Sequence, residues 1–354
     1  MLAEVVRLFI PSYSGTEVFF MENEQINVQS GKKTAKSWAN LVSIALSVLA
    51  FGFLFLTLVK FKDAADHKSY LYIWDLFGAG QFQFMFVIGY ALLIASVPLL
   101  VSAFVFEKKG SAISTAASAC QFLAAVAFVI TPMMYRDSMG GNSCTMEIGL
   151  ALSFAFVLAA SLFSFIYAFS KMPMTVHDIA EDAILVAAAF ALNFAKIPVP
   201  WAFTGGSINF QMLPLFIIAL RHGPLHGVIA GGIVYGLLTC FTDGYGFVTY
   251  PYDYLIGFGS IAVLGFFKPF IMGEKQKGYN IKGEIFLAVG VLLATVVRLA
   301  GSTISSMVVY EYTFIDALAY NATYIPASGV VALVVLMLLY GPLLRVNKLL
   351  PARE

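Results

Sequence analysis

The residues best suited to chemistry lie in the segment Tyr245–Tyr254, YGFVTYPYDY, where tyrosines surround one carboxylate, Asp253. A carboxylate among aromatic faces fits a flat organic cation, because the anion supplies charge and the rings supply cation–π attraction of about 1–2 kcal/mol. Tyrosines also gather at membrane interfaces, and a carboxylate just after Pro251 can favour a helix N-terminus. Two interpretations stay open: a site for an organic cation, and an aromatic belt beside a helix end.

Two more polar residues stand out further along the chain. Arg298 lies within an apolar stretch, where a charge is costly unless it faces protein or a water-filled cavity. It is therefore either a structural partner for Asp253 or Glu311, or a ligand contact. Asn321, in YNATYIP, can both donate and accept hydrogen bonds, which suits the edge of a heteroaromatic ring. The alternative for Asn321 is a helix cap in a turn.

Small residues recur at a spacing of four, which places them in one stripe on a helix. The stripe consists of Ala183, Ala187, Ala191 and Ala195. Small stripes let helices approach closely in lipid. The stripe either packs inside the protein or docks onto another membrane subunit.

The segment Trp201–Pro214, WAFTGGSINFQMLP, contains residues that break regular helix, namely Gly205, Gly206 and Pro214. It is either an outer loop leading into a short helix or a lid over an outward-facing pocket.

Signatures of enzymes are absent from the sequence: it has no HExxH, GxSxG or phosphate-binding loop. His222 and His226 are four residues apart, but they lie in the glycine- and proline-containing turn RHGPLHG, where we expect no metal site. The cysteines form no CxxC pair. We therefore expect no enzyme activity, no catalytic residues, no metal and no cofactor.

The elements that position these residues must lie in a membrane. Of the residues, 60% are hydrophobic and 12% are charged, and the mean hydropathy is +0.85. Soluble domains carry about 25% charged residues. The net charge of +1 shows no footprint of nucleic-acid binding. The composition predicts an all-α integral membrane protein in a lipid bilayer.

A membrane-spanning helix needs about 20 mostly apolar residues, and about ten segments qualify. In the first half they are Trp38–Val59, Phe82–Phe106, Ile113–Met134 and Ile148–Phe169. In the second half they are Ile179–Ile197, Ile208–Leu220, Val228–Thr242, Tyr254–Phe270, Ile285–Tyr310 and Ala327–Leu344. We expect a polar cytoplasmic leader (1–37), a four-helix region of unknown role (38–170) and a six-helix substrate-binding domain (178–347). The distribution of Lys and Arg places both termini in the cytoplasm of a multi-pass cell-membrane protein.

Four segments of the second half resemble a known family. They are Gly205–Gly223, Gly227–Leu238, Tyr250–Gly265 and Tyr320–Pro326, in the same order and with the same spacing. Residues of about 178 to 344 are similar to the thiamine-specific substrate-binding (S) component of energy-coupling-factor transporters. The resemblance does not extend to the first four helices.

The resemblance implies roles for particular residues. It implies that Asp253 and Tyr254 lie under the thiazolium ring, that Asn321 contacts the pyrimidine, and that Tyr235 is an aromatic contact on the third helix. Tyr245 is a further candidate for a substrate contact, because it lies in the same tyrosine-rich segment as Asp253. Three positions depart from the family: its Lys, His and Trp fall on Arg298, Ser302 and Tyr310.

The resemblance also implies partners. The family captures thiamine from outside and works with a transmembrane coupling subunit and two cytoplasmic ATPases, and the Ala183–Ala195 stripe occupies the place of its docking helix. Another vitamin or a pyrimidine stays open as the substrate. A protein of another class, a membrane enzyme or sensor carried by the first four helices, stays open as well.

Overall fold

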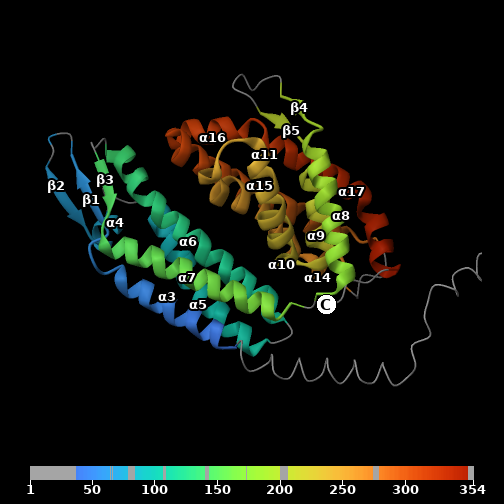
Figure 1. Ribbon diagram of the computed structural model, residues 1–354, viewed down its shortest axis with the longest axis horizontal. Coiled ribbons are helices and arrows are strands. Elements are labelled where there is room, and N and C mark those ends of the chain that lie inside the picture. The colour runs from blue at the N-terminus through green and yellow to red at the C-terminus, as the bar shows by residue number, and fades with distance from the viewer. Residues whose placement is uncertain are drawn as a thin grey trace, which may run out of the picture.

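The computed structural model describes residues 37–349, except 64, 66, 79–83, 107–108, 140–142, 173, 200–205 and 274–278. Residues 1–36 of the predicted leader lie outside the described residues, as does most of the glycine-containing part of the predicted lid. The described chain is mostly helical and forms two helical bundles, one from each half of the sequence (Figure 1).

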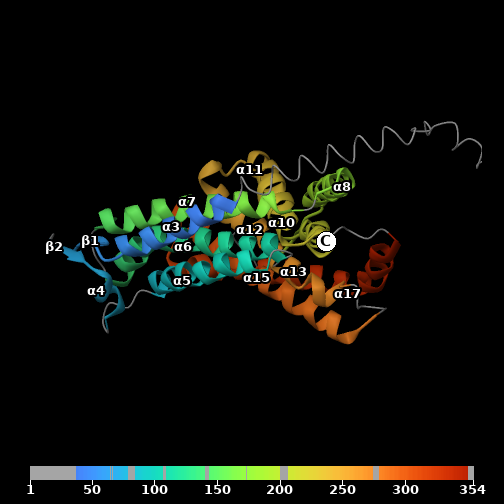
Figure 2. The same cartoon turned by 90° about the horizontal axis from the view of Figure 1, so that it is seen from below.

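The first bundle consists of four long helices that lie side by side (Figure 2). They are α3 (Ser37–Phe53), α5 (Phe84–Val105), α6 (Gly110–Met139) and α7 (Ile148–Ser170). A buried amide joins three of them, α3, α6 and α7: Gln121 Nε2 donates to Ser43 Oγ at 3.0 Å, and Ser164 Oγ donates to Gln121 Oε1 at 2.7 Å. Polar groups that pair inside an apolar bundle fix which helix faces meet.

A small antiparallel sheet covers one end of this bundle, with the strand order β2–β1–β3 (Figure 1). Its strands are β1 (Val59–Lys62), β2 (Lys68–Leu71) and β3 (Ser143–Met146). The short helix α4 (Ile73–Phe77) follows β2 in the chain. The prediction of an all-α chain was wrong here. The predicted span Trp38–Val59 ends as a helix at Phe53, and a turn follows. From Val59 the chain forms a strand, VKFK, whose residues alternate between buried and partly exposed positions.

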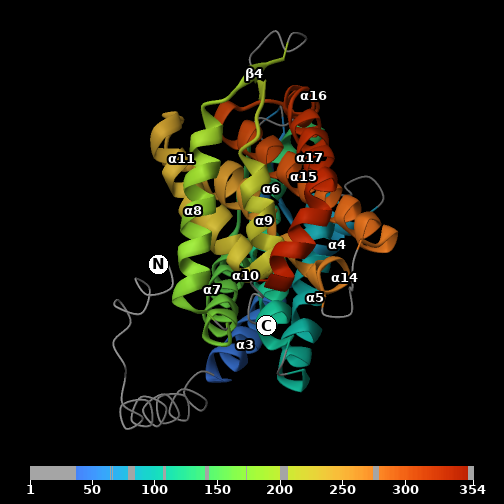
Figure 3. The ribbon, with the colours of Figure 1, turned by 90° about the vertical axis from the view of Figure 1, so that its right-hand side faces the viewer.

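The second bundle carries the predicted binding residues. Its long helices are α8 (Val176–Asn193), α9 (Met212–His222), α15 (Ile281–Tyr310) and α17 (Ile325–Leu349). Shorter helical segments connect them: α10 (Pro224–Gly227), η2 (Val228–Tyr235), α11 (Gly236–Asp243), η3 (Phe247–Thr249), η4 (Tyr250–Ile256), α12 (Gly257–Gly259), α13 (Ala262–Phe266), α14 (Lys268–Ile271) and α16 (Phe314–Ala322). The hairpin β4 (Ile197–Pro198) and β5 (Ser207–Ile208) lies with α16 at one end, and α10 and α14 lie toward the other (Figure 3).

Two segments of this bundle, η2 and η4, are π-helical. Such wide turns are rare and occur often at functional sites. Glycine lets them meet: a Cβ on Gly232 of η2 would lie 3.0 Å from the carbonyl oxygen of Leu255 on η4. The glycine-rich segment that the sequence marked as irregular is therefore a point of close backbone approach.

Six helical segments are long and apolar enough to cross a membrane. They are Phe84–Val105, Gly110–Arg136, Ile148–Ser170, Pro224–Asp243, Ile281–Tyr310 and Phe314–Leu349. Trp38–Phe53 and Met212–His222 are shorter apolar helices. The multi-pass membrane character is confirmed, whereas the number of about ten spans stays a prediction.

The two bundles pack together through α6, which lies against η4, α15 and α16. An apolar cluster at this contact contains Val126, Ile130, Ile256, Met307 and Ala317. Beside it, the rings of Phe84 and Phe314 meet edge to face, with 5.9 Å between their centroids. The first bundle therefore packs against η4, α15 and α16, the elements that carry Asp253, Arg298 and Asn321.

Candidate functional site

Asp253 lies on η4, and its carboxylate is held by α15. The hydroxyl of Ser302 donates a short hydrogen bond to Asp253 Oδ1. Among the residues that the structure describes, no cation forms an ion pair with this carboxylate. The structure thus brings Asp253 and Ser302 together and leaves the carboxylate without a direct ion pair among the described residues.

Glycine allows α15 to approach η4 closely enough for this bond. A Cβ on Gly301 would lie 2.6 Å from the backbone oxygen of Tyr252. Any larger residue there must push the two segments apart. Gly301 therefore sets the distance between the backbones that carry Asp253 and Ser302.

Arg298 lies one turn before Ser302 on α15 and is buried, at 9% exposure. Its guanidinium carbon lies 4.9 Å from the centroid of the Phe258 ring, a cation–π contact. Neither of its two predicted structural partners forms an ion pair with it: Asp253 bonds Ser302, and Glu311 is exposed beyond the end of α15. The site thus holds a buried cation and a carboxylate close together without a direct pair.

Asn321 is fully buried on α16, and it is not a cap in a turn. Its Nδ2 donates to Ser306 Oγ and to the backbone oxygen of Ala317, both at 2.9 Å, and its Oδ1 accepts from the Tyr324 hydroxyl at 2.9 Å. An amide oxygen has two lone pairs. One acceptor position of Asn321 is therefore left for a ligand in this conformation.

Tyr235 and Tyr254 are buried, and both pack against the ring of Phe258. Tyr235 packs edge to face on Phe258, with 4.8 Å between the ring centroids, and its hydroxyl donates to Gln211 Oε1 at 2.6 Å. The hydroxyl of Tyr254 donates to Asp243 Oδ2 at 3.3 Å. These residues form an aromatic wall next to Asp253 and Arg298.

Tyr245 and Tyr310 lie at the outside of the site, at 62% and 49% exposure. Tyr245 follows α11 in a turn in which Gly244 and Gly246 adopt φ values of 76° and 88°. Tyr310 is the last residue of α15 and neighbours Tyr312, with 6.1 Å between the ring centroids. In this conformation the two tyrosines form an open rim and do not enclose Asp253.

The sequence did not single out several residues that organise the site. They are Gln211, Asp243, Phe258, Ser306 and Tyr324. A signal existed for Ser306, because it follows Ser302 by four residues and must share its helix face. The other contacts depend on the tertiary fold.

The alanine stripe on α8 faces away from the bundle. Ala183, Ala187 and Ala191 are exposed, whereas Val186, Ala189 and Asn193 form the buried side of the helix. Ala195 lies beyond the last helical residue, Asn193, so only three of the four alanines share the helix. Internal packing therefore does not account for these three residues.

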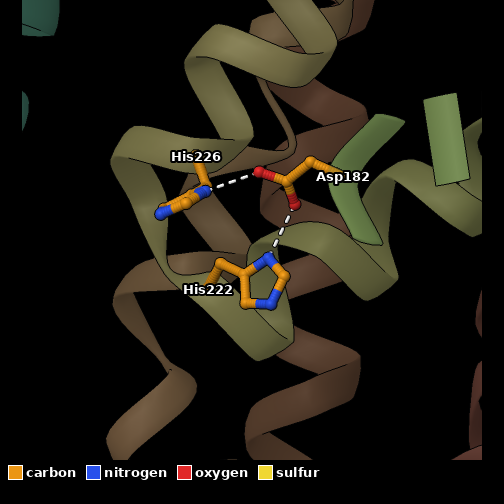
Figure 4. A group of neighbouring side chains, drawn as sticks. All are labelled: Asp182, His222 and His226. Atoms are coloured by element: carbon orange, nitrogen blue, oxygen red, sulfur yellow. Dashed lines mark hydrogen bonds and ion pairs between the residues drawn. The ribbon is translucent and has the colours of Figure 1, made fainter. Parts of the chain in front are cut away.

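The turn RHGPLHG, for which we expected no metal site, brings His222 and His226 to the same carboxylate, Asp182 (Figure 4). Gly223 ends α9 with a φ of 97°, and α10 begins at once, so both rings turn toward α8. The sequence missed this cluster because Asp182 is 40 residues from His222.

The fold and the site define a class: a multi-helix membrane protein with a carboxylate set among tyrosines. The profile of the family described as Thiamine transporter protein (Thia_YuaJ) matches residues 179–348, the second bundle. The chain is similar to the thiamine transporter ThiT of Bacillus subtilis (strain 168), with 30% identity over 181 residues, which cover 45% of this chain and 88% of that relative. No solved structure gives a significant match.

The chain therefore belongs to the thiamine transporter family. It is a transporter component rather than an enzyme. The predicted resemblance is confirmed for the second bundle, and the first bundle lies outside the matched residues.

Proposed function

We propose that this protein is the substrate-binding subunit of an energy-coupling-factor vitamin importer and that it captures thiamine, or a close analogue, from the outer face of the cell membrane. Thiamine joins a cationic thiazolium ring to an aminopyrimidine ring. Such a ligand needs an anion, aromatic faces and a polar edge. Asp253, Tyr254 with Tyr235, and Asn321 supply these three features within one bundle.

One observation carries the proposal: Asp253 is anchored by Ser302 and forms no direct ion pair among the described residues, although the buried Arg298 lies near it. A charge in an apolar span is costly unless it is paired or serves a function. A ligand cation at Asp253 supplies the direct pairing. Arg298 lies near Asp253 but packs against the ring of Phe258. In the proposed complex it therefore faces the neutral part of the ligand or the hydroxyethyl tail.

Uphill transport needs energy, and the sequence has no phosphate-binding loop to supply it. We infer that the energy comes from partners: a transmembrane coupling subunit and two cytoplasmic ATPases. The exposed face of α8 at Ala183, Ala187 and Ala191 supports this inference, because small residues permit close approach of another helix.

The first bundle is the main argument for a different function. It has its own buried polar network and its own sheet, and it lies outside the family match. A sensor or enzyme carried by this bundle is the second candidate. Within the transporter class, a different vitamin or a pyrimidine is the alternative substrate.

Titration calorimetry on the purified full chain tests the proposal. We expect saturable, one-to-one binding of thiamine at micromolar concentrations and weaker binding of other vitamins and of free pyrimidines. No heat of binding with thiamine, in a preparation shown to be folded, would remove thiamine as the substrate. Reconstitution in liposomes tests whether transport requires partner subunits, because the chain alone should then not accumulate thiamine.

A further inference from the structure

A second polar cluster lies where α8, α9 and α10 meet, away from the end of the bundle that carries α16 and the β4–β5 hairpin (Figure 3). One carboxylate joins two imidazoles there (Figure 4): His222 Nδ1 lies 2.6 Å from Asp182 Oδ1, and His226 Nδ1 lies 2.5 Å from Asp182 Oδ2. The two rings have 5.0 Å between their centroids. This cluster has no part in the proposed capture of thiamine.

The cluster is buried and rich in carboxylates. The side chains of His222 and His226 are 1% and 5% exposed. His222 Nε2 also lies 3.3 Å from Glu181 Oε2 and 3.9 Å from Asp178 Oδ1. Arg221 forms a bidentate pair with Glu181. Among the described residues of this cluster, three carboxylates therefore face one guanidinium and two imidazoles.

The hydrogen bonding of the cluster is incomplete. His222 Nε2 is buried and makes no hydrogen bond, although Glu181 lies close by. Buried polar atoms are normally paired, and one that is not requires an explanation such as an absent ion. The excess of carboxylates over fixed cations and the missing hydrogen bond at His222 Nε2 both point to a missing cation.

The groups present select the kind of cation. Imidazole nitrogens with a carboxylate suit Zn²⁺ and related transition metals, whereas Mg²⁺ and Ca²⁺ prefer oxygen ligands alone. One ligand atom from each of Asp182, His222 and His226 lies within 4.8 Å of the others. In a tetrahedral site with bonds of about 2.0–2.1 Å, ligand atoms are separated by roughly 3.3 Å. The two Nδ1–Asp182 distances of 2.6 and 2.5 Å are hydrogen-bond distances, so a bound ion would replace these two bonds and the ligand atoms would move apart slightly.

We propose that Asp182, His222 and His226 bind one divalent transition-metal ion of the Zn²⁺ class. The ion offsets the excess of carboxylates over fixed cations and ties α8 to the turn between α9 and α10. Because α8 also carries the exposed alanines, the ion fixes the position of the helix that the proposed partner would contact. Glu181 and Asp182, at 21% and 16% side-chain exposure, leave a way in for the ion.

Metal content of the purified full chain tests this proposal, with an affinity tag free of histidine. The protein is stripped with a chelator, incubated with ZnCl₂ alone, dialysed, and analysed by elemental mass spectrometry. We expect one Zn²⁺ per chain and an upward shift in the thermal midpoint. The matched variants are His226→Asn, which keeps a donor near the Nδ1 position, and His177→Asn, which alters an exposed histidine of α8 outside the cluster.

His226→Asn should lower Zn²⁺ affinity at least about 100-fold, because loss of a ligand costs no less than loss of an outer-shell partner. His177→Asn should bind as the wild type does, and both variants should keep wild-type affinity for thiamine. Absence of stoichiometric Zn²⁺ in the stripped and reloaded wild type overturns the proposal. Equal Zn²⁺ binding by His226→Asn and wild type also overturns it. The wild-type measurement decides the question even if a variant does not fold.

Discussion

Asn321 donates an amide proton to Ser306 Oγ at 2.9 Å, and Ser306 lies one helical turn beyond Ser302, the residue that holds Asp253. Ser306 Oγ in turn donates to the backbone oxygen of Ser302 at 3.0 Å. One face of α15 therefore fixes both the proposed thiazolium contact and the proposed pyrimidine contact. The distance between the two ends of the ligand site is set by a single helix.

The Ser306–Asn321 bond gives a first prediction. Ser306→Ala should lower the free energy of unfolding by about 1–3 kcal/mol, because a buried amide proton of Asn321 loses its acceptor. It should also weaken thiamine binding, since Asn321 is then free to turn. Reversible unfolding in mixed micelles and calorimetry measure the two effects. In a double-mutant cycle, Ser306→Ala should cost little once Asn321→Leu is present; additive costs would show that the bond is unimportant.

The close approach at Gly301 gives a second prediction. Gly301→Ala should weaken thiamine binding at least about tenfold and destabilise the protein by about 1–3 kcal/mol, because its Cβ would lie 2.6 Å from the Tyr252 oxygen. Gly341→Ala on α17 is the matched control, since a Cβ there meets nothing within 4 Å. If both substitutions leave binding unchanged, the close approach at Gly301 does not set the spacing between Ser302 and Asp253 that binding needs.

The sequence predicted the features that depend on local composition and spacing. Long apolar runs gave the helices of the first bundle and α15, and the spacing of Ala183, Ala187 and Ala191 gave one exposed face of α8. The aromatic segment around Asp253 was also visible, because its residues are neighbours in the chain.

Features that join distant segments could not be read from the sequence. The Ser302–Asp253 bond spans 49 residues, and the pairing of β1 with β3 joins strands more than 80 positions apart in the numbering. The helix α16 was missed because nine residues after a turn are too few for a clear apolar period. The convergence of His222 and His226 needs the positive φ of Gly223, which a residue pattern does not reveal.

Topology gives a third prediction. Cys144 is half-buried on β3, and burial raises the pKa of its thiol to about 12. At neutral pH its thiolate fraction is about 1,000-fold smaller than that of an ordinary cysteine, because the fraction falls tenfold for each pH unit below the pKa. An impermeant thiol reagent should therefore label Cys144 slowly in intact cells, and the rate should rise about tenfold for each pH unit.

The neighbouring residue is the better probe of orientation. Thr145 is exposed on the same strand, so Thr145→Cys in a Cys144→Ser background should react rapidly from outside. Cys144→Ser alone is the control for reaction at Cys120 and Cys240. Reaction of the Thr145→Cys variant only after the cells are opened would place this sheet in the cytoplasm and invert the predicted topology.

The exposed face of α8 gives a fourth prediction. Ala187→Trp should abolish thiamine uptake by cells while purified protein keeps its affinity for thiamine within about twofold, because bulk on this face blocks close helix approach. Leu338→Trp on α17 is the control, since Leu338 is 75% exposed and already bulky. Loss of binding together with uptake in Ala187→Trp would mean that the substitution disturbs the bundle itself.

A thermodynamic cycle that varies residue 253 and the charge of the ligand tests most directly whether Asp253 recognises the thiazolium cation. Calorimetry compares thiamine with an analogue whose thiazolium is replaced by a neutral thiophene ring, on wild type and on Asp253→Asn. We expect wild type to prefer thiamine over the neutral analogue by about 10- to 100-fold, as a desolvated charge pair of about 1.5–3 kcal/mol implies. We expect Asp253→Asn to bind both ligands equally. An undiminished preference for thiamine in Asp253→Asn would contradict the claim that this carboxylate recognises the cation.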